Sequence, residues 1–211
     1  RNSQQTGLGM ITLDRQEGLW KITLNRPEKA NSLTAAMLQD LAEIAEAAQQ
    51  ARGLIITGAG GVFSAGGDLD EMTDGLATSA LWERLSTAIA AVPGLSIAAL
   101  NGTLAGGAMG MALACDIRLA VPQAKFFYPV MKRGFLPQPS DPLRMSALIG
   151  PARTKLILMG GQKLTAQEAL QFGLIELVVE PEDLLPTAEN IAADTMAASP
   201  EIARGIRMLC G

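Results

Sequence analysis

The chain has 211 residues, enough for one domain with a substantial buried core. Hydrophobic residues make up 48% of it and charged residues 18%, a balance that excludes an intrinsically disordered chain. The net charge of −4 offers no basic footprint for a nucleic acid or an anionic membrane, and the absence of histidine removes imidazole catalysis and histidine-ligated metals. Cys115 and Cys210 form no metal-binding spacing, so we expect no metal site and free thiols in a reducing, cytoplasmic compartment.

One segment is long enough to cross a membrane. No charged residue occurs between Leu85 and Cys115. Three breaks interrupt the segment at short intervals: Pro93-Gly94, Asn101-Gly102 and Gly106-Gly107. Such breaks favour a buried strand, a turn and a buried helix. A membrane protein built on this segment is kept as a distant alternative.

The first half of the chain alternates strand and helix patterns. Strands at 10–13 and 19–24 flank a turn at 16–18, which predicts a hairpin. Apolar residues at helical spacing follow over 33–50, with Ser32 or Thr34 as the cap. Four further elements are predicted in order: a strand at 54–57, a helix at 81–91, a strand at 96–100 and a helix at 107–115.

The second half continues the alternation. It predicts a strand at 117–120, helices near 142–149 and 152–159, a strand at 174–179 and a helical tail from Leu184. Thr165 and Glu168 form a capping box for one more helix, which Gly173 ends. Strands that alternate with helices indicate an α/β domain with mainly parallel pairing. We predict a core over residues 1–185 and a helical C-terminal segment over 186–211.

Two glycine-rich stretches follow predicted buried strands, over 63–69 and 101–110. Loops at the carboxyl ends of parallel strands are where α/β domains bind ligands, and glycine leaves backbone N–H groups accessible there. Gly106-Gly107 also stands at a predicted helix start, where free N–H groups favour a developing negative oxygen. Two such groups that converge would form an oxyanion hole. The alternative is that these glycines only turn the chain and permit close packing. Neither stretch fits a P-loop or a complete dinucleotide fingerprint.

Several blocks, in the same order, resemble the enoyl-CoA hydratase/isomerase (crotonase) superfamily. They are Leu24-Asn25-Arg26-Pro27-Glu28-Lys29-Ala30-Asn31-Ser32-Leu33, Thr57–Gly60 with Phe63–Leu69, Asn101–Asp116, Pro129 with Gly134, and Leu164–Ala169 with Phe172–Ile175. The resemblance covers nearly the whole chain, and blocks in the right order are far more specific than any single motif.

The resemblance implies a spiral of ββα units, assembled as trimers or dimers of trimers, that binds acyl-CoA thioesters of fatty acid metabolism. It implies no separate cofactor, because coenzyme A is part of the substrate. The oxyanion donors match the backbone N–H groups of Gly67 and Gly107, which the glycine pattern also indicates. Positions that match substrate contacts are Lys29, Ala30, Ala65, Gly66, Asp68, Leu69, Gly106, Pro129 and Val130. Family members run longer, so we expect further helices after the segment 186–211.

The chain departs from the family pattern where hydratases of the family carry their two glutamates. Those positions match Gly110 and Val130, and neither residue can move a proton. A position where some isomerases carry an acid matches Gln138, an amide. We therefore expect no ordinary hydration.

Few candidates remain for proton transfer. Asp141 is a lone base or the cap of the following helix, and the cap is the commoner use of Asp before Pro. Tyr128 is a hydrogen-bond donor or a buried structural residue. Met72, Phe127, Met131 and Phe135 line an acyl pocket for an uncharged group or belong to the plain core.

Two hypotheses of different classes follow. In the first, the protein is an enzyme, a lyase or isomerase, that stabilises a thioester enolate during isomerisation, decarboxylation or a retro-Claisen step. In the second, it is a family member that keeps the acyl-CoA pocket but has lost catalysis. Gly110, Val130 and Gln138 favour the second hypothesis, whereas Gly67 and Gly107 favour the first.

Overall fold

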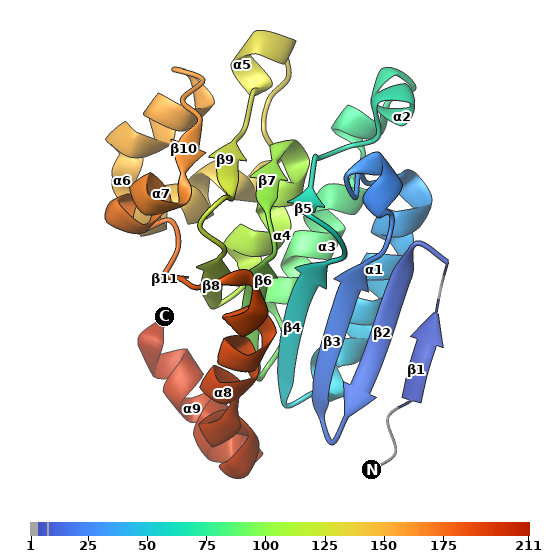
Figure 1. Cartoon of the computed structure of the whole chain (residues 1–211), viewed down its shortest axis with the longest axis vertical. Coiled ribbons are helices and arrows are strands. Elements are labelled where there is room, and N and C mark those ends of the chain that lie inside the picture. The colour runs from blue at the N-terminus through green and yellow to red at the C-terminus, as the bar shows by residue number, and fades with distance from the viewer. Residues whose placement is uncertain (1–3, 8) are drawn as a thin grey trace.

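Two β-sheets form the framework of the computed structural model, which describes residues 4–7 and 9–211 (Figure 1). The larger sheet has the order β1-β2-β3-β4-β6-β8-β11, with β1 and β2 antiparallel to their neighbours and the other pairs parallel. Its strands are β1 (Gln4–Gly7), β2 (Ile11–Gln16), β3 (Leu19–Leu24), β4 (Gly53–Gly58), β6 (Leu95–Leu100), β8 (Ile117–Ala120) and β11 (Leu177–Val178). The predicted hairpin is confirmed as β2–β3, whose two-residue turn at Glu17 and Gly18 has positive φ at both residues.

The smaller sheet was not predicted from the sequence. It has the order β10-β9-β7-β5, with β5 (Val62–Ser64), β7 (Thr103–Ala105), β9 (Lys125–Phe127) and β10 (Leu164–Thr165). Each of these strands has two or three residues, too few to show an alternating pattern. β5, β7 and β9 each follow a parallel strand of the larger sheet (β4, β6 and β8), and a helix comes next. These units confirm the expected spiral of ββα repeats.

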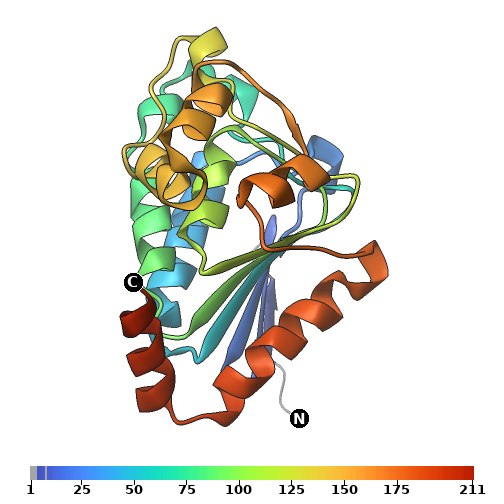
Figure 2. The same cartoon turned by 90° about the vertical axis from the view of Figure 1, so that its left-hand side faces the viewer.

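The helices lie on both faces of the larger sheet (Figure 2). On one face, α1 (Ala35–Ala47) packs against α3 (Leu81–Ala90), which packs against α4 (Met109–Ala114). α8 (Leu184–Ala197) lies on the opposite face and contacts β4, β6 and β8. The remaining α-helices are α2 (Leu69–Thr73), α5 (Val130–Arg133), α6 (Ser140–Leu158), α7 (Ala166–Phe172) and α9 (Pro200–Cys210). Short 3-10 turns occupy Pro27–Lys29, Ala48–Gln50, Leu76–Thr78, Gly106–Ala108 and Pro181–Asp183.

Several helix ends follow the predicted signals. Thr34 caps α1 by accepting a hydrogen bond from the Met37 N–H at 3.1 Å. Thr165 caps α7 in the same way, and Gly173 ends that helix in the left-handed conformation. The two predicted helices near 142–149 and 152–159 are confirmed as the two parts of α6, which are separated by a kink at Gly150, a residue with a non-helical φ of 81°. The helical tail is interrupted before Pro200 and so contains two helices.

The strand predicted over 174–179 is shorter than expected. Regular pairing with β8 begins at Leu177. The N–H groups of Leu174 and Ile175 donate to the Ala169 carbonyl at the end of α7, so they are not available to a ladder. Helix capping and strand pairing require the same backbone N–H groups here. Those of Leu174 and Ile175 are used to cap α7, so the strand begins later.

The uncharged segment Leu85–Cys115 is divided between α3, β6, β7 and α4 in the core, as predicted. Within residues 4–7 and 9–211, no helix combines the length and the apolar character needed to cross a bilayer. The helical C-terminal part is confirmed as α8 and α9. The division of the chain at residues 185 and 186 stays a prediction.

Candidate functional site

Two glycine loops meet at the ends of adjacent strands. The β5–α2 loop (residues 65–68) and the β7–α4 loop (residues 106–108) follow β5 and β7, which pair in parallel. Gly66 and Gly106 both have positive φ, at 97° and 60°. A β-carbon on Gly66 would lie 3.0 Å from the Ala105 carbonyl oxygen. The two loops therefore touch through their backbones, at a position that only glycine permits.

The backbone N–H of Gly67 points away from Leu33, the residue that forms a β-bridge with Gly67. Leu33 bridges this loop in parallel, donating to the Gly66 carbonyl and accepting from the Asp68 N–H, both at 2.8 Å. Because backbone groups alternate in direction along an extended segment, the N–H of Gly67 points to the opposite side. The N–H of Gly107 lies in the first turn before α4, where helical partners are lacking. Neither N–H donates to a loop or side-chain acceptor in the described part of the chain.

Trp82 of α3 supports both glycines. A β-carbon on Gly107 would lie 3.0 Å from Trp82 Cζ3, and one on Gly67 would lie 3.4 Å from Trp82 Cζ2. The indole N–H donates to the Leu76 carbonyl at 2.8 Å, which fixes the ring. The sequence placed Trp82 on a predicted helix, but it gave no signal that the ring lies under the two loops.

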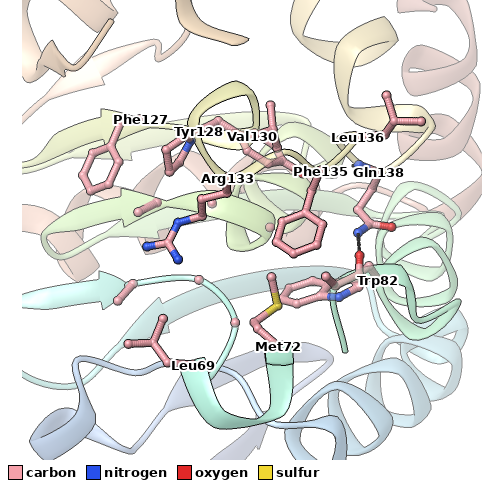
Figure 3. Close-up of a pocket in the computed structure, with 18 residues that line it drawn as sticks. Leu69, Met72, Trp82, Phe127, Tyr128, Val130, Arg133, Phe135, Leu136 and Gln138 are labelled. Atoms are coloured by element: carbon pink, nitrogen blue, oxygen red, sulfur yellow. Dashed lines mark hydrogen bonds between the residues drawn. The ribbon is translucent and has the colours of Figure 1, made fainter. Parts of the chain in front are cut away.

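A cavity of about 100 Å³ opens above these loops (Figure 3). Nine of the positions predicted to bind substrate or act in catalysis line it: Ala65, Gly66, Gly67, Leu69, Gly106, Gly107, Pro129, Val130 and Gln138. Among the predicted acyl-pocket residues, Met72, Phe127 and Phe135 also line the cavity, whereas Met131 does not. Arg133 is the one charged residue among those that line it. The walls are otherwise mainly apolar.

Lys29 and Ala30 lie beside the β5–α2 loop and Asp68 ends it, and none of the three lines the cavity. Lys29 ends an exposed 3-10 turn, and the Ala30 carbonyl accepts from the Ala65 N–H at 3.0 Å. Asp68 accepts from the Arg26 guanidinium at 2.8 Å, and this hydrogen bond lowers the pKa of its carboxyl group. Asp68 also caps α2 by accepting from the N–H groups of Asp70 and Glu71.

Glu71 of α2 has a partner on another helix. It accepts from the Ala35 N–H at 2.6 Å. Glu71 therefore ties α2 to the start of α1. Asp70, next to it, is exposed.

The interpretation of Asp141 as a helix cap is wrong. Its side chain accepts from the Tyr128 hydroxyl at 2.8 Å, and it accepts from no backbone N–H of α6. The start of α6 is held instead by Glu83 of α3, which accepts from both the N–H and the hydroxyl of Ser140, at 2.8 and 2.7 Å. This cap comes from a residue distant in the sequence, so local sequence patterns do not reveal it.

Asp141 is fully buried. Burial raises the pKa of its carboxyl group to about 6, against the opposing effect of the Tyr128 hydrogen bond. Its Oδ1 atom has no hydrogen-bond partner among the described residues and lies 2.8 Å from where a β-carbon on Gly110 would stand. Gly110 thus leaves room for the carboxylate of Asp141.

The side chain of Gln138 lines the cavity and connects it to the 3-10 turn at Leu76–Thr78. Its side-chain amide donates to the Ala77 carbonyl at 3.2 Å, a bond that Figure 3 shows. Its backbone N–H makes a long contact of 3.4 Å to the Tyr128 oxygen. Tyr128 is buried and is counted among the residues that line the cavity.

Comparisons with known proteins agree with this architecture. The model of the enoyl-CoA hydratase/isomerase family matches residues 14–208. The Bacillus subtilis protein YngF is 37% identical over 195 residues, which cover 88% of this chain and 75% of YngF. Ethylmalonyl-CoA decarboxylase of Pongo abelii is 29% identical over 217 residues, covering 97% of this chain and 72% of that protein. The solved enoyl-CoA hydratase/isomerase of Pseudoalteromonas atlantica has a TM-score of 0.87 and 27% identity, covering 95% of this chain and 82% of that one.

The family model and the relative YngF each cover most of the chain, so this protein belongs to the enoyl-CoA hydratase/isomerase family of the crotonase superfamily.

Proposed function

We propose that this protein binds an acyl-CoA thioester and stabilises its enolate through the backbone N–H groups of Gly67 and Gly107. The observation that carries the proposal is the pair of adjoining glycine loops, in which the N–H groups of Gly67 and Gly107 lack loop and side-chain acceptors and both glycines pack near one buried indole. Two fixed donors aimed at a developing oxyanion stabilise it strongly in a site that excludes water. Removal of one such donor typically costs about 10²- to 10³-fold in rate.

The reaction proposed is not ordinary hydration. Addition of water across an alkene needs an acid and a base beside the bound acyl group. The residues that line the cavity include no carboxylate, and Val130 stands at its wall. Isomerisation, decarboxylation and a retro-Claisen step place a smaller demand on side chains. Of these we favour decarboxylation, because the departing carbon dioxide leaves its electron pair in the enolate that the two N–H groups stabilise.

The proposed substrate side of the cavity is apolar. Met72, Phe127 and Phe135 contribute to its walls, which suits an uncharged acyl chain beyond the thioester. Residues in or beside the β5–α2 loop are proposed to border the coenzyme A moiety, as the family resemblance implies: Lys29, Ala30, Ala65, Gly66, Asp68 and Leu69. Gly106, Pro129 and Val130 are proposed to border the thioester.

A binding protein without turnover is the second candidate. One observation favours it: Tyr128 and Arg133 are the titratable groups among the residues that line the cavity. Burial holds the pKa of Tyr128 well above its ordinary value, so by itself it is a weak acid at neutral pH.

Calorimetric titration with a panel of CoA thioesters, including malonyl-type thioesters, tests both candidates. Each mixture is then analysed by mass spectrometry. Loss of carbon dioxide from a malonyl-type thioester supports the enzyme, and binding with every thioester recovered intact, and with no isomer detected by chromatography, supports the binding protein. No binding by the folded protein contradicts both. Assembly into trimers or dimers of trimers and a cytoplasmic location stay predictions, the first of which light scattering on the eluting protein tests.

A further inference from the structure

A buried carboxylate lies behind the cavity and takes no part in the function proposed so far. Asp141, in the first turn of α6, is 0% exposed. Its Oδ2 atom accepts from Tyr128, and its Oδ1 atom has no partner among the described residues. A buried and half-satisfied carboxylate is costly to keep, because its ionised form loses hydration without full compensation. Its presence at this position therefore calls for a function.

The position of Asp141 is set by α4. Gly110 follows Gly107 by three residues, which places the two on the same side of the chain as it enters α4. Oδ1 of Asp141 lies 2.8 Å from the β-carbon position of Gly110. The carboxylate thus occupies the space that the side chain of residue 110 would otherwise fill. Position 110 on α4 matches a glutamate position of the hydratases. In this protein α6 supplies a carboxylate, that of Asp141, at the place where the side chain of residue 110 would begin.

Tyr128 connects Asp141 to the cavity. It follows β9, which pairs with β7, the strand that leads into Gly106 and Gly107. Tyr128 counts among the cavity-lining residues, and its hydroxyl oxygen lies 2.8 Å from Asp141 Oδ2. A tyrosine that lines a cavity and whose hydroxyl is hydrogen-bonded to a carboxyl group can pass a proton in either direction.

We propose that Asp141 and Tyr128 form a proton relay to the α-carbon of the thioester bound at Gly67 and Gly107. The inference rests on the proposed function. Tyr128 is the group that meets the substrate, and Asp141 is a positioning residue that acts through it.

The relay balances in both directions. When the enolate is protonated, the Tyr128 O–H bond breaks and a C–H bond forms at the α-carbon. The Tyr128 oxygen then takes the proton of the neutral Asp141 carboxyl group, which is left ionised and regains a proton from solvent. When the thioester is deprotonated, the ionised Asp141 carboxylate takes the hydroxyl proton of Tyr128 as the Tyr128 oxygen takes the α-proton.

The charged groups around Asp141 come from two packed helices. Glu83 of α3 raises its pKa, and Arg144 of α6 lowers it, while burial makes the largest contribution. Arg144 donates to the Ser86 hydroxyl at 3.0 Å, and Glu83 is held by Ser140. α4 contributes Gly110, which has no charge. These groups leave Asp141 able to change its protonation state near neutral pH, as a relay requires.

Exchange of the α-hydrogens of butyryl-CoA in heavy water tests the relay without knowledge of the natural substrate. Asp141→Asn keeps the size of the side chain and cannot titrate, and Tyr128→Phe removes the hydroxyl while it keeps the ring. We expect each variant still to bind butyryl-CoA and to exchange its α-hydrogens about 10²-fold more slowly than the wild type. Asp183→Asn is the matched control, because Asp183 is exposed and its side chain makes no capping hydrogen bond.

The pH profile separates the relay from a structural role. Exchange by the wild type should rise with pH through an apparent pKa of about 6, because the ionised carboxylate accepts the proton, and this rise should be absent in Asp141→Asn. Unchanged exchange with an unchanged profile in Asp141→Asn overturns the relay and leaves the proposed function standing. Binding without exchange by the wild type also overturns it. If Asp141→Asn does not fold, Tyr128→Phe decides alone, and exchange by it at the wild-type rate overturns the relay. Absence of butyryl-CoA binding by the wild type contradicts the proposed function itself.

Discussion

Trp82 lies directly against Gly107, such that a β-carbon at position 107 would stand 3.0 Å from the indole Cζ3 atom. A real β-carbon there would be closer to the ring than ordinary van der Waals contact allows, and the ring is held by its hydrogen bond to the Leu76 carbonyl. The direction of the Gly107 N–H therefore depends on the absence of a side chain. The first prediction follows from this contact.

Gly107→Ala should lower turnover of a productive thioester by about 10²-fold, the size of the loss of one oxyanion donor. The methyl group would push the β7–α4 loop or the indole, and the N–H would turn away from the oxygen. Steady-state kinetics measure the loss, and Gly61→Ala is the control because its β-carbon would meet no atom within 4 Å. In the Gly107→Ala background, Trp82→Phe should recover part of the activity by making room. Full activity of Gly107→Ala would contradict the oxyanion role.

Glu83 supplies the cap of α6 from α3. Glu83→Ala should lower the free energy of unfolding by about 1–2 kcal/mol, because it frees the Ser140 N–H that Glu83 Oε1 accepts at 2.8 Å. Glu83→Gln should cost less, since an amide oxygen still accepts that bond. Urea denaturation measures both changes. Glu182→Ala, at an exposed position, is the control, and an equal effect of Glu83→Ala and the control would contradict the capping role.

The sequence was sufficient for β2, β3, β4, β6 and β8 of the larger sheet and for the two glycine loops, whereas the edge strand β1 was not predicted and β11 is shorter than the strand predicted. Hydrophobic runs of four to six residues and local caps such as Thr34 and Thr165 act within a few residues, so they are visible in the sequence. The smaller sheet was missed because its strands are short and depend on pairing between distant segments.

In the candidate site too, features set by local sequence were predicted, and features set by packing between distant segments were missed. The strand-to-loop pattern singled out the two glycine-rich stretches, and the family resemblance pointed to Gly67 and Gly107 within them. The contacts of Asp141 were not predicted, because they depend on how α6 packs against α3 and α4. The supporting position of Trp82 under both loops has the same origin. Local motifs fix backbone geometry, whereas the environment of a buried side chain is fixed by tertiary packing.

The two cysteines should differ in reactivity. Burial raises the pKa of Cys115 to about 12, so its thiolate is scarce at neutral pH, whereas Cys210 is exposed on α9. A thiol reagent at pH 8 should label one cysteine quickly in the native protein and two after denaturation. Cys210→Ser should abolish the fast labelling and leave Cys115 to react at the rate of unfolding. Rapid labelling of Cys115 in that variant would contradict its burial.

Asp141 also makes stability depend on pH. Its pKa is about 6 in the folded protein and about 3.9 in an unfolded chain. The folded state therefore binds a proton more tightly than the unfolded state does. The resulting stabilisation is present below about pH 4 and is lost as pH rises through about 6.

Asp141→Asn removes this dependence, because asparagine does not titrate. From pH 4 to pH 8, the stability of Asp141→Asn relative to the wild type should increase by about 2 kcal/mol, out of the roughly 3 kcal/mol that a two-unit pKa difference represents. Urea denaturation of both proteins across this range measures the difference, in which the effects of the other carboxylates cancel. A constant difference would mean that the pKa of Asp141 is unshifted in the folded protein, and a decrease would mean that the carboxylate is stabilised in its ionised form.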